Sequence, residues 1–304
     1  IVSDLIPFAE NISVITYKSS PETRNFSNKV KIYTLRNNDT NKFFAYLKFV
    51  IIFFSIIQKH RNTVVFSHMT ETLSAVVSPF TRFLKVKHYL WYAHKSKPLR
   101  LRWCNIFVDK IITSTKNSCP INNNKVIPIG QAIKYQDFSC SSDIKHDSSK
   151  INAIHVGRID PSKKIDKIID IFFSETANSD AILHLVGEPT DGNTAYLNQC
   201  KTKFKKQIES GTLVFHGRYN HYEIMNLLCK CQIFIHLFQG SLDKSLVEAI
   251  FTKIYVITSN NEFHNDFPSL LNRSIGWSDE DYLRFQLKQY FEITSAQIET
   301  LNNE

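Results

Sequence analysis

Two short segments of the chain combine cations, glycine and hydroxyl groups in the way that a phosphate-binding turn requires. The first segment, residues 156–163, follows an apolar run of strand type and contains Gly157, Arg158 and Lys163. Fixed cations on such a turn can stabilise the charge that a diphosphate leaving group gathers as its bond breaks, without a metal ion. For this segment taken alone, a solvated loop with ordinary surface cations is an equal alternative.

The second segment, residues 238–249, runs from the end of a predicted strand through a tight turn into a helix. Free backbone N–H groups at that helix start would point at a phosphate. Glu248, about one turn inside the helix, can accept hydrogen bonds from both hydroxyls of a ribose. The alternative for Glu248 is a surface carboxylate that pairs with a nearby lysine. The turn itself consists of Gly240, Ser241, Leu242, Asp243, Lys244 and Ser245.

These two segments need a scaffold that brings strand ends together, and the remaining sequence predicts one. Short apolar runs of β type alternate with longer segments of helical period, which is typical of parallel sheets covered by helices. In the first half we expect strands at 12–17, 30–33, 63–67, 88–92, 110–115 and 125–129, and helices at 43–58, 70–84 and 99–108. In the second half we expect strands at 151–156, 181–186, 213–216, 233–237 and 255–258, and helices at 164–176, 196–210, 221–229 and 245–251.

A polar, serine-rich stretch at 139–150 separates the two halves and has no apolar period. It predicts a linker between a first lobe, 1–138, and a second lobe, 151–304. Two doubly wound α/β lobes joined in this way would place a ligand cleft between them, at the carboxyl ends of both sheets.

The chain is basic, with a net charge of +9 over 304 residues. Such a charge suits nucleic acid, an anionic membrane surface or a phosphorylated substrate. Nucleic acid is not an expected partner, because the cations are spread along the chain and no recognised nucleic-acid motif is present. The one basic cluster, 201–206, is expected to form the solvated face of a helix.

Six scattered cysteines are expected to be free thiols in a reducing compartment, since Cys229 and Cys231 alone are close in sequence. No apolar run approaches the roughly 20 residues that cross a bilayer. The chain opens on Ile1 without the features of a secretory signal. We therefore expect a cytoplasmic protein, and the start on Ile1 suggests that the sequence is N-terminally incomplete.

Together these segments resemble the family-4 glycosyltransferases, also called glycosyl transferases group 1. The resemblance covers residues 151–261 and rests on five patterns in order: the Gly-Arg-x4-Lys turn, Leu185-Val186-Gly187, Val214-Phe215-His216-Gly217, the run 231–235, and Leu246-Val247-Glu248-Ala249 followed by 256–258. It implies the GT-B fold, with two Rossmann-like parallel α/β lobes facing across a cleft. It also implies an enzyme, a retaining hexosyltransferase that uses a nucleotide sugar and needs no metal or other cofactor.

The resemblance also assigns roles to individual residues. Arg158 and Lys163 would bind the donor diphosphate and act in catalysis, next to Gly157. Glu248 would bind the donor ribose. Arg218 and Tyr219, just after the strand that ends at 217, would lie near the base. The turn residues Gly240, Ser241, Leu242, Asp243, Lys244 and Ser245 would complete the donor site.

One departure from the family concerns the transferred sugar. Members commonly carry a glutamate that contacts this sugar at the position of Gly240. We expect altered sugar contacts rather than lost activity. Asp243 is a substitute for that carboxylate, or else the N-cap of the following helix.

The first lobe resembles the acceptor lobe of the same family less closely. The resemblance implies that the first βα unit of this lobe is missing, because the predicted strand 12–17 already looks like the second strand of such enzymes. His94 follows the predicted strand 88–92, and the resemblance implies that a histidine there approaches the reacting sugar. The alternative for His94 is a hydrogen-bonded loop histidine. The usual run after the last strand of this lobe is replaced by Gln131-Ala132-Ile133-Lys134.

The expected partners are a nucleotide sugar and a glycan or lipid-linked acceptor. We also expect peripheral contact with the cytoplasmic face of a membrane through the aromatic and basic segment 42–59, with Phe49, Phe53 and Phe54 exposed. The alternative is a buried helix, which the segment suits better because it is apolar nearly all round. Two alternatives to the transferase are a non-catalytic subunit that binds nucleotide sugar and a sugar-nucleotide epimerase of the same fold.

Overall fold

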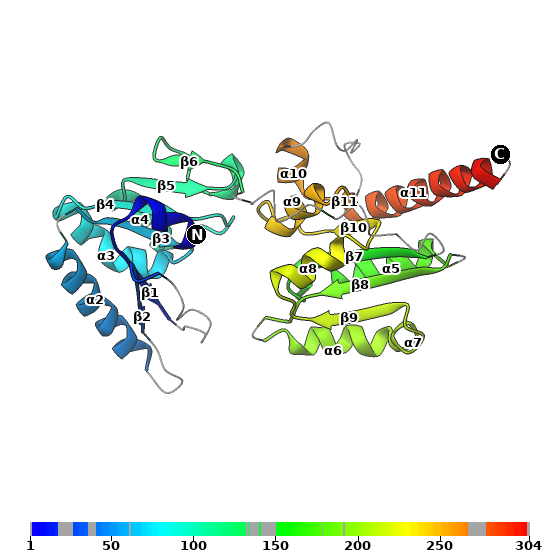
Figure 1. Cartoon of the computed structure of the whole chain (residues 1–304), viewed down its shortest axis with the longest axis horizontal. Coiled ribbons are helices and arrows are strands. Elements are labelled where there is room, and N and C mark those ends of the chain that lie inside the picture. The colour runs from blue at the N-terminus through cyan, green and yellow to red at the C-terminus, as the bar shows by residue number, and fades with distance from the viewer. Residues whose placement is uncertain are drawn as a thin grey trace. The chain divides into compact units, whose positions relative to one another are not determined.

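A computed structural model describes most of the chain (Figure 1). The described residues are 2–17, 27–35, 41–60, 62–131, 133, 140, 150–177, 179–190, 192–266 and 278–302, the last ten of these by their backbone alone. They divide into two compact units, Ile1–Pro128 and Ile129–Glu304. No sheet crosses this division among the described strands, so the prediction of two parallel α/β lobes is confirmed.

The first unit contains a parallel sheet of four strands in sequential order, β3-β4-β5-β6, and a separate parallel pair, β1-β2. Its apolar core lies between the four-stranded sheet and the helices, around Leu90, Leu101 and Ile111. The strands are β1 (Ile12–Thr16), β2 (Val30–Thr34), β3 (Val64–His68), β4 (Lys87–Trp91), β5 (Lys110–Thr113) and β6 (Val126–Pro128). The helices are α1 (Val2–Leu5), α2 (Lys42–Lys59), α3 (Glu71–Phe83) and α4 (Leu99–Phe107), with short 3-10 helices at Ile6–Phe8 and Lys116–Ser118.

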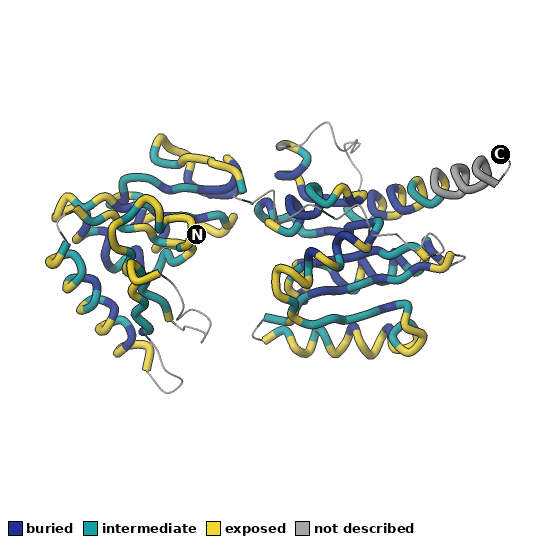
Figure 2. Tube along the Cα trace, viewed as in Figure 1, coloured by how far each residue is buried: buried dark blue, intermediate teal, exposed yellow. Residues whose placement is uncertain are grey.

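Helix α2 buries one side and exposes the other, as Figure 2 shows along its length. Phe49 and Phe53 are 6% and 5% exposed, and Phe54 packs edge-on against Phe80 of α3. The prediction that these three rings meet a membrane is therefore wrong for Phe49 and Phe53, because they form the core beneath the helix. The exposed apolar side chains of α2 are Phe43, Phe44, Leu47 and Ile51. No helix in the described part of the chain has the length and apolar character to span a bilayer.

The second unit contains a parallel sheet of five strands in the order β11-β10-β7-β8-β9. The chain runs outward from β7 in one direction through β8 and β9, and then continues on the other side of β7 with β10 and β11. Ligands of such sheets bind where the strand order reverses, outside the carboxyl ends of the two central strands. Here those strands are β7 and β10. The bounds are β7 (Ile151–Val156), β8 (Ala181–Val186), β9 (Leu213–Gly217), β10 (Ile233–His236) and β11 (Tyr255–Thr258).

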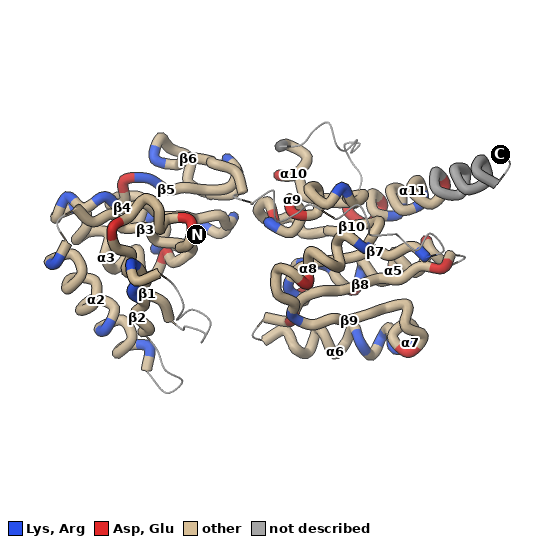
Figure 3. Tube along the Cα trace, in the orientation of Figure 1, with Lys and Arg blue, Asp and Glu red and all other residues tan. Residues whose placement is uncertain are grey.

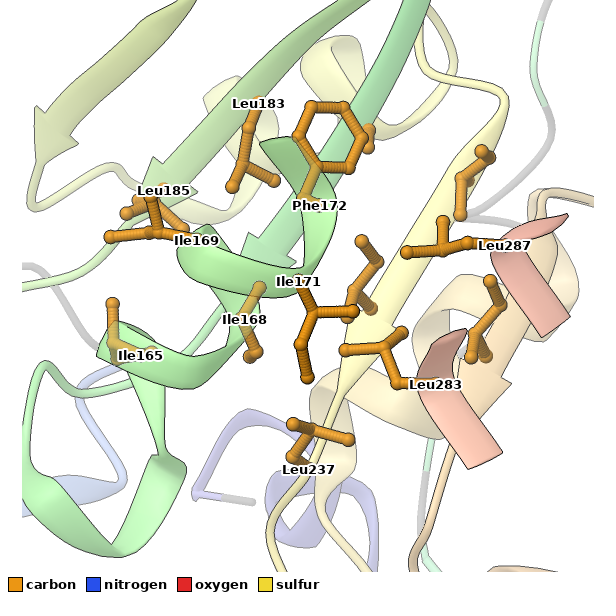
Figure 4. Packing of buried hydrophobic residues seen from close by; sticks show 14 of the residues in the cluster. Ile165, Ile168, Ile169, Ile171, Phe172, Leu183, Leu185, Leu237, Leu283 and Leu287 are labelled. Atoms are coloured by element: carbon orange, nitrogen blue, oxygen red, sulfur yellow. The ribbon is translucent and has the colours of Figure 1, made fainter. Parts of the chain in front are cut away.

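Apolar residues at helical spacing attach α5 to this sheet. Ile165, Ile168, Ile169 and Phe172 are fully buried and pack with Leu183 and Leu185 of β8 (Figure 4). Leu283 and Leu287 of α11 join the same core, so this helix packs onto its own unit. The helices are α5 (Ile165–Glu175), α6 (Thr194–Lys203), α7 (Lys205–Glu209), α8 (His221–Leu228), α9 (Lys244–Phe251), α10 (Asn261–Asp266) and α11 (Asp279–Asn302).

The predicted helix 196–210 is in fact two helices, α6 and α7, which divide at the buried Phe204. The lysines of the predicted basic cluster, 201–206, are exposed on the two helices, and only Phe204 in this segment is buried. Figure 3 shows that the other cations are likewise distributed over both units. The cluster is therefore a solvated helix face, as predicted.

The division between the units lies upstream of the predicted linker because the segment after Pro128 contacts the second unit. Gln131 Nε2 donates to the carbonyl oxygen of Leu242 at 2.7 Å, and Ile133 packs against the core around Phe234. Cys140 forms a disulfide with Cys229 at the end of α8. The prediction of six free thiols is wrong for this pair, while Cys104, Cys119, Cys200 and Cys231 are free and buried. Most of the predicted linker, 141–149, lies outside the described residues.

Candidate functional site

The turn after β7 is held close to the turn after β8. Gly157 N–H donates to the carbonyl oxygen of Val186 at 2.9 Å. Gly187 adopts φ +143, and a Cβ there would lie 1.9 Å from the carbonyl oxygen of Gly157. The motif around Leu185-Val186-Gly187 therefore ends in glycine because the two backbones approach too closely for a side chain.

Local capping then directs Lys163 inward. Asp160 caps the 3-10 helix Pro161–Lys163 by accepting from the backbone N–H of Ser162 at 3.0 Å. Lys164, at φ +53, ends this helix and starts α5. The Lys163 side chain is 5% exposed, whereas that of Arg158 is 63% exposed and has Asp160 Oδ2 at 3.9 Å from its Nε.

The turn after β10 is held by two amide side chains that the sequence analysis did not select. Asn260, which is fully buried, donates from Nδ2 to the carbonyl oxygens of Phe238 at 2.8 Å and Ser241 at 3.4 Å. Gln131 bonds the next carbonyl, that of Leu242. The sequence could have identified Asn260 by its position, since it lies two residues beyond the predicted strand 255–258. The carboxyl end of that strand lies at the same edge of the sheet as the turn. These bonds fix the backbone of the turn ahead of α9.

Lys163 and Asp243 connect the two turns by an ion pair between the Nζ and Oδ2 atoms. The ammonium also lies 3.6 Å from the centroid of the Phe238 ring, a cation–π contact. Two of the predicted segments thus meet at the point where the strand order reverses. Asp243 occupies the N-cap position of α9, which was one of the two alternatives for this residue, but its side chain makes no capping hydrogen bond with the described N–H groups of the helix.

Asp243 also accepts a hydrogen bond from His236 Nε2 at 3.0 Å. Burial raises the pKa of Asp243, but the hydrogen bond from His236 and the charge of Lys163 outweigh burial and hold this pKa well below its ordinary value. Burial lowers the pKa of His236, against the opposing effect of Asp243. At neutral pH Asp243 is therefore a carboxylate, and the imidazole of His236 behind it is neutral.

Phe238 occupies the space that a side chain at position 240 would need. A Cβ on Gly240 would lie 1.9 Å from Cζ of the Phe238 ring and 2.1 Å from Cε1. Neither distance is tolerable for two carbon atoms, so the ring position requires glycine at 240. The apolar ring, and no carboxylate, borders the site here.

Glu248 lies at the first turn of α9 and is buried, with an 8% exposed side chain. Its Oε1 atom is 3.1 Å from Lys244 Nζ and 4.0 Å from His221 Nδ1. The lysine pairing that we considered as the alternative is therefore present, although Glu248 itself is not a surface residue. α9 begins at Lys244, so the N–H groups of 241–245 belong to the turn and the first turn of this helix.

Tyr219, after β9, is tied to a line of hydrogen bonds across the sheet. Its hydroxyl lies 2.8 Å from His216 Nδ1, His216 Nε2 lies 2.9 Å from His184 Nδ1, and His184 Nε2 lies 3.1 Å from Asn152 Oδ1. Because the last acceptor is an amide oxygen, each group donates toward Asn152, beginning with the tyrosine hydroxyl. Burial lowers the pKa of both histidines, that of His184 to about 4. Arg218 beside Tyr219 is exposed.

His94 belongs to the first unit and lies three residues beyond the end of β4. It is exposed, and its Nδ1 accepts a hydrogen bond from the backbone N–H of Ser96 at 3.0 Å. The proton of the neutral ring is thus on Nε2. This geometry fits both a loop histidine and a catalytic one.

Residues 141–267, in the second unit, match the model of the glycosyl transferases group 1. The matched segment covers less than half of the chain. It contains both turns and the ion pair between them, and it confirms the prediction of a glycosyltransferase. The assignment to family 4 stays a prediction.

Solved structures similar to the chain extend this result to the fold. Sucrose-phosphate synthase from Thermosynechococcus elongatus has a TM-score of 0.78 at 13% identity, over 96% of this chain and 82% of that one. HepE from Anabaena, solved in complex with UDP and glucose, has a TM-score of 0.73 at 13% identity, over 96% and 85%. A glycosyltransferase from Rickettsia africae has a TM-score of 0.68 at 13% identity, over 95% and 82%. The predicted GT-B fold is confirmed, and no curated protein matches the chain.

Two further predictions stay as they were. Among the residues that the structure describes, no three His, Cys, Asp or Glu side chains are grouped to hold a metal ion. The prediction that the reaction needs no metal or other cofactor stays a prediction. The roles assigned to individual residues are likewise predictions that the geometry does not test.

Proposed function

We propose that the chain transfers a sugar from a nucleotide-sugar donor to a glycan or lipid-linked acceptor, with retention and without a metal. The observation that carries the proposal is the meeting of the turns after β7 and β10 through Lys163 and Asp243. It lies at the reversal of the strand order, where parallel sheets bind nucleotides. The segment that matches the glycosyl transferases group 1 model surrounds it.

The donor diphosphate would lie between Arg158 and the start of α9. Arg158 is exposed and keeps its charge, with Asp160 only at 3.9 Å. The buried ammonium of Lys163 supplies a second cation, and the N–H groups around Ser241 supply partial positive charge. Glu248 would accept the ribose hydroxyls after exchange with Lys244, and Tyr219 and Arg218 would border the base. A catalytic role of His94 is a further part of the proposal.

The similar structures suggest which donor to test first. HepE was solved with UDP-glucose as well as with UDP and glucose. At 13% identity these ligands support the choice of a uridine donor for the first assays and leave the transferred sugar open. Gly240 and Phe238 make the sugar position less polar than a glutamate would, so a panel of sugars is needed.

The test is calorimetric titration with UDP and with GDP, followed by a donor-hydrolysis assay with and without EDTA. We expect micromolar nucleotide binding and slow hydrolysis that EDTA does not abolish. Binding without turnover would favour the non-catalytic subunit, and an epimerised donor would favour the epimerase. Absence of binding to any nucleotide or nucleotide sugar would overturn the proposal.

Lys163→Ala tests the site itself. It should weaken UDP binding or hydrolysis, since it removes a cation beside the diphosphate. Lys167→Ala is the matched control, because Lys167 lies on α5 nearby but is exposed and paired with Glu280 at 3.5 Å. Equal effects of the two variants would argue against the assigned pocket.

Membrane contact from the cytoplasmic face remains a separate part of the proposal. It is supported by the exposed Phe43, Phe44, Leu47 and Ile51 on α2, which begins and ends with lysine. Such a surface suits the headgroup region of an anionic bilayer. Co-sedimentation with phosphatidylglycerol vesicles should fall when Phe43 and Phe44 become serine, and unchanged sedimentation would contradict the contact.

A further inference from the structure

The side chain of Asp243 turns away from the helix that Asp243 begins. It is the N-cap residue of α9, where a capping carboxylate contributes about 1 kcal/mol. No such cap bond is formed with the described N–H groups. The carboxylate instead meets the ammonium of Lys163 and the imidazole of His236. The helix start thus forgoes a cap, and the carboxylate is directed to the turn after β7.

The hydrogen bonds behind Asp243 allow a single arrangement of protons. Asp243 is a carboxylate and can only accept, so the neutral ring of His236 donates to it from Nε2 at 3.0 Å. His236 Nδ1 then accepts from the hydroxyl of Thr258 at 3.0 Å, and the same hydroxyl oxygen accepts from the backbone N–H of Asn260 at 3.1 Å. Thr258 and His236 are both fully buried. The orientation of the carboxylate is thus determined from the core of the sheet.

The same carboxylate determines where the Lys163 ammonium lies. A free lysine side chain carries about 2 kcal/mol of rotamer entropy, which binding a ligand would have to overcome. Here the ammonium is held between Asp243 and the Phe238 ring, and the side chain is 5% exposed. The entropy is lost on folding, so the cation is already in place when a ligand arrives.

We propose that Asp243 is a positioning residue for glycosyl transfer, holding the Lys163 ammonium where the departing diphosphate gains charge, with His236 and Thr258 supporting it. The inference rests on the proposed function. In the ground state Asp243 offsets part of the lysine charge, so the pair adds little to donor binding. As the glycosidic bond breaks, the additional charge of the diphosphate meets a cation that does not have to move. Asp243 therefore acts on kcat more than on KM.

Asp243→Asn tests this inference, because asparagine keeps the size of the side chain and removes its charge. We expect kcat for donor hydrolysis to fall about 10- to 100-fold. The KM and the Kd for UDP should be unchanged or lower, since Lys163 loses its counter-ion. Asp243→Glu, which restores the charge at a shifted position, should recover part of kcat. The matched control is Asp170→Asn, which breaks an exposed pair with Lys203 on α6 and should leave kcat and KM unchanged.

Wild-type kcat in Asp243→Asn would overturn the inference, and a lower melting temperature with unchanged kcat would show that the ion pair is structural alone. If Asp243→Asn does not fold, Thr258→Val gives the second test. It keeps the ion pair and removes the hydroxyl that holds His236 at Nδ1, so kcat should fall about threefold at constant KM, and an unchanged kcat would again overturn the inference. Failure of the proposed function looks different: the wild type itself would neither bind UDP nor hydrolyse a donor.

Discussion

The Phe238 ring lies directly over the α-carbon of Gly240, so that a Cβ on Gly240 would come within 1.9 Å of the ring. The same ring covers the ammonium of Lys163 at 3.6 Å from its centroid. Gly240 has no positive φ, so the requirement for glycine comes from the ring and not from the backbone conformation. The two residues are therefore coupled, and a change at either one affects Lys163.

The first prediction is that Gly240→Ala displaces the ring and costs about 1–3 kcal/mol of unfolding free energy, as overpacking does. Phe238→Ala removes the ring that a Cβ at 240 would meet. The double variant should therefore lose less unfolding free energy than the two single variants together, by about 1 kcal/mol or more. Urea unfolding of the four proteins in this double-mutant cycle measures the coupling. Additive effects would mean that the Phe238 ring can move aside without a loss of unfolding free energy.

Arg158→Ala should reduce kcat/KM for the donor by a factor equivalent to about 2–4 kcal/mol, mainly through kcat, because its target gains charge as the bond breaks. Steady-state hydrolysis at several donor concentrations separates the two constants. Arg284→Ala provides the comparison, since Arg284 is also half-exposed and paired with a carboxylate, Glu175, at 2.7 Å. A rise in KM with constant kcat would assign Arg158 to ground-state binding.

Acid should destabilise the fold below about pH 6.5. Burial lowers the pKa of His88 and His184 to about 4 and that of His155 to about 3. The unfolded chain binds protons at these histidines near their ordinary pKa of about 6.5, while the folded chain does not. The stability that these histidines contribute is therefore fully present above about pH 6.5. It is lost as the pH falls toward 4, and the total loss is a few kcal/mol.

Urea unfolding at about pH 7.5 and about pH 5 measures this loss. The histidine Cε1 proton resonances of the folded protein identify the groups, since His88 and His184 should titrate near 4. Constant stability across this interval, or titration of these resonances near 6.5, would contradict the prediction.

The disulfide between Cys140 and Cys229 joins residues 89 positions apart. In the chain-entropy model a loop of this length contributes about 4–5 kcal/mol to stability. Cys229→Ser should lower the melting temperature of the oxidised protein and should have little effect under strong reduction. Thiol titration of the unreduced protein in denaturant should find the four free cysteines of the six in the chain. Six reactive thiols would show that the bond does not form.

Local patterns in the sequence were sufficient for the elements and for the two turns. The spacing of Ile165, Ile168, Ile169 and Phe172 predicts a helix with one buried face, and the structure has α5 there. Gly157 and Gly240 mark the turns, because Gly157 directly follows one predicted apolar strand and Gly240 lies three residues beyond the end of another. Periodicity and turn residues are properties of neighbours in the chain, so they are visible without coordinates.

The partners of the charged groups were decided by tertiary structure. From the sequence, Asp243 was either a contact of the transferred sugar or a helix cap, and its ion pair with Lys163 was not among the alternatives. The order of the strands places β7 beside β10, and this adjacency brings Lys163 within reach of a residue 80 positions away. Packing within the first unit likewise directs Phe49 and Phe53 inward, and the fold of the second unit brings Cys140 to Cys229. Contacts between distant segments depend on which strands pair and which faces are covered, and a pattern within one segment carries no information about either.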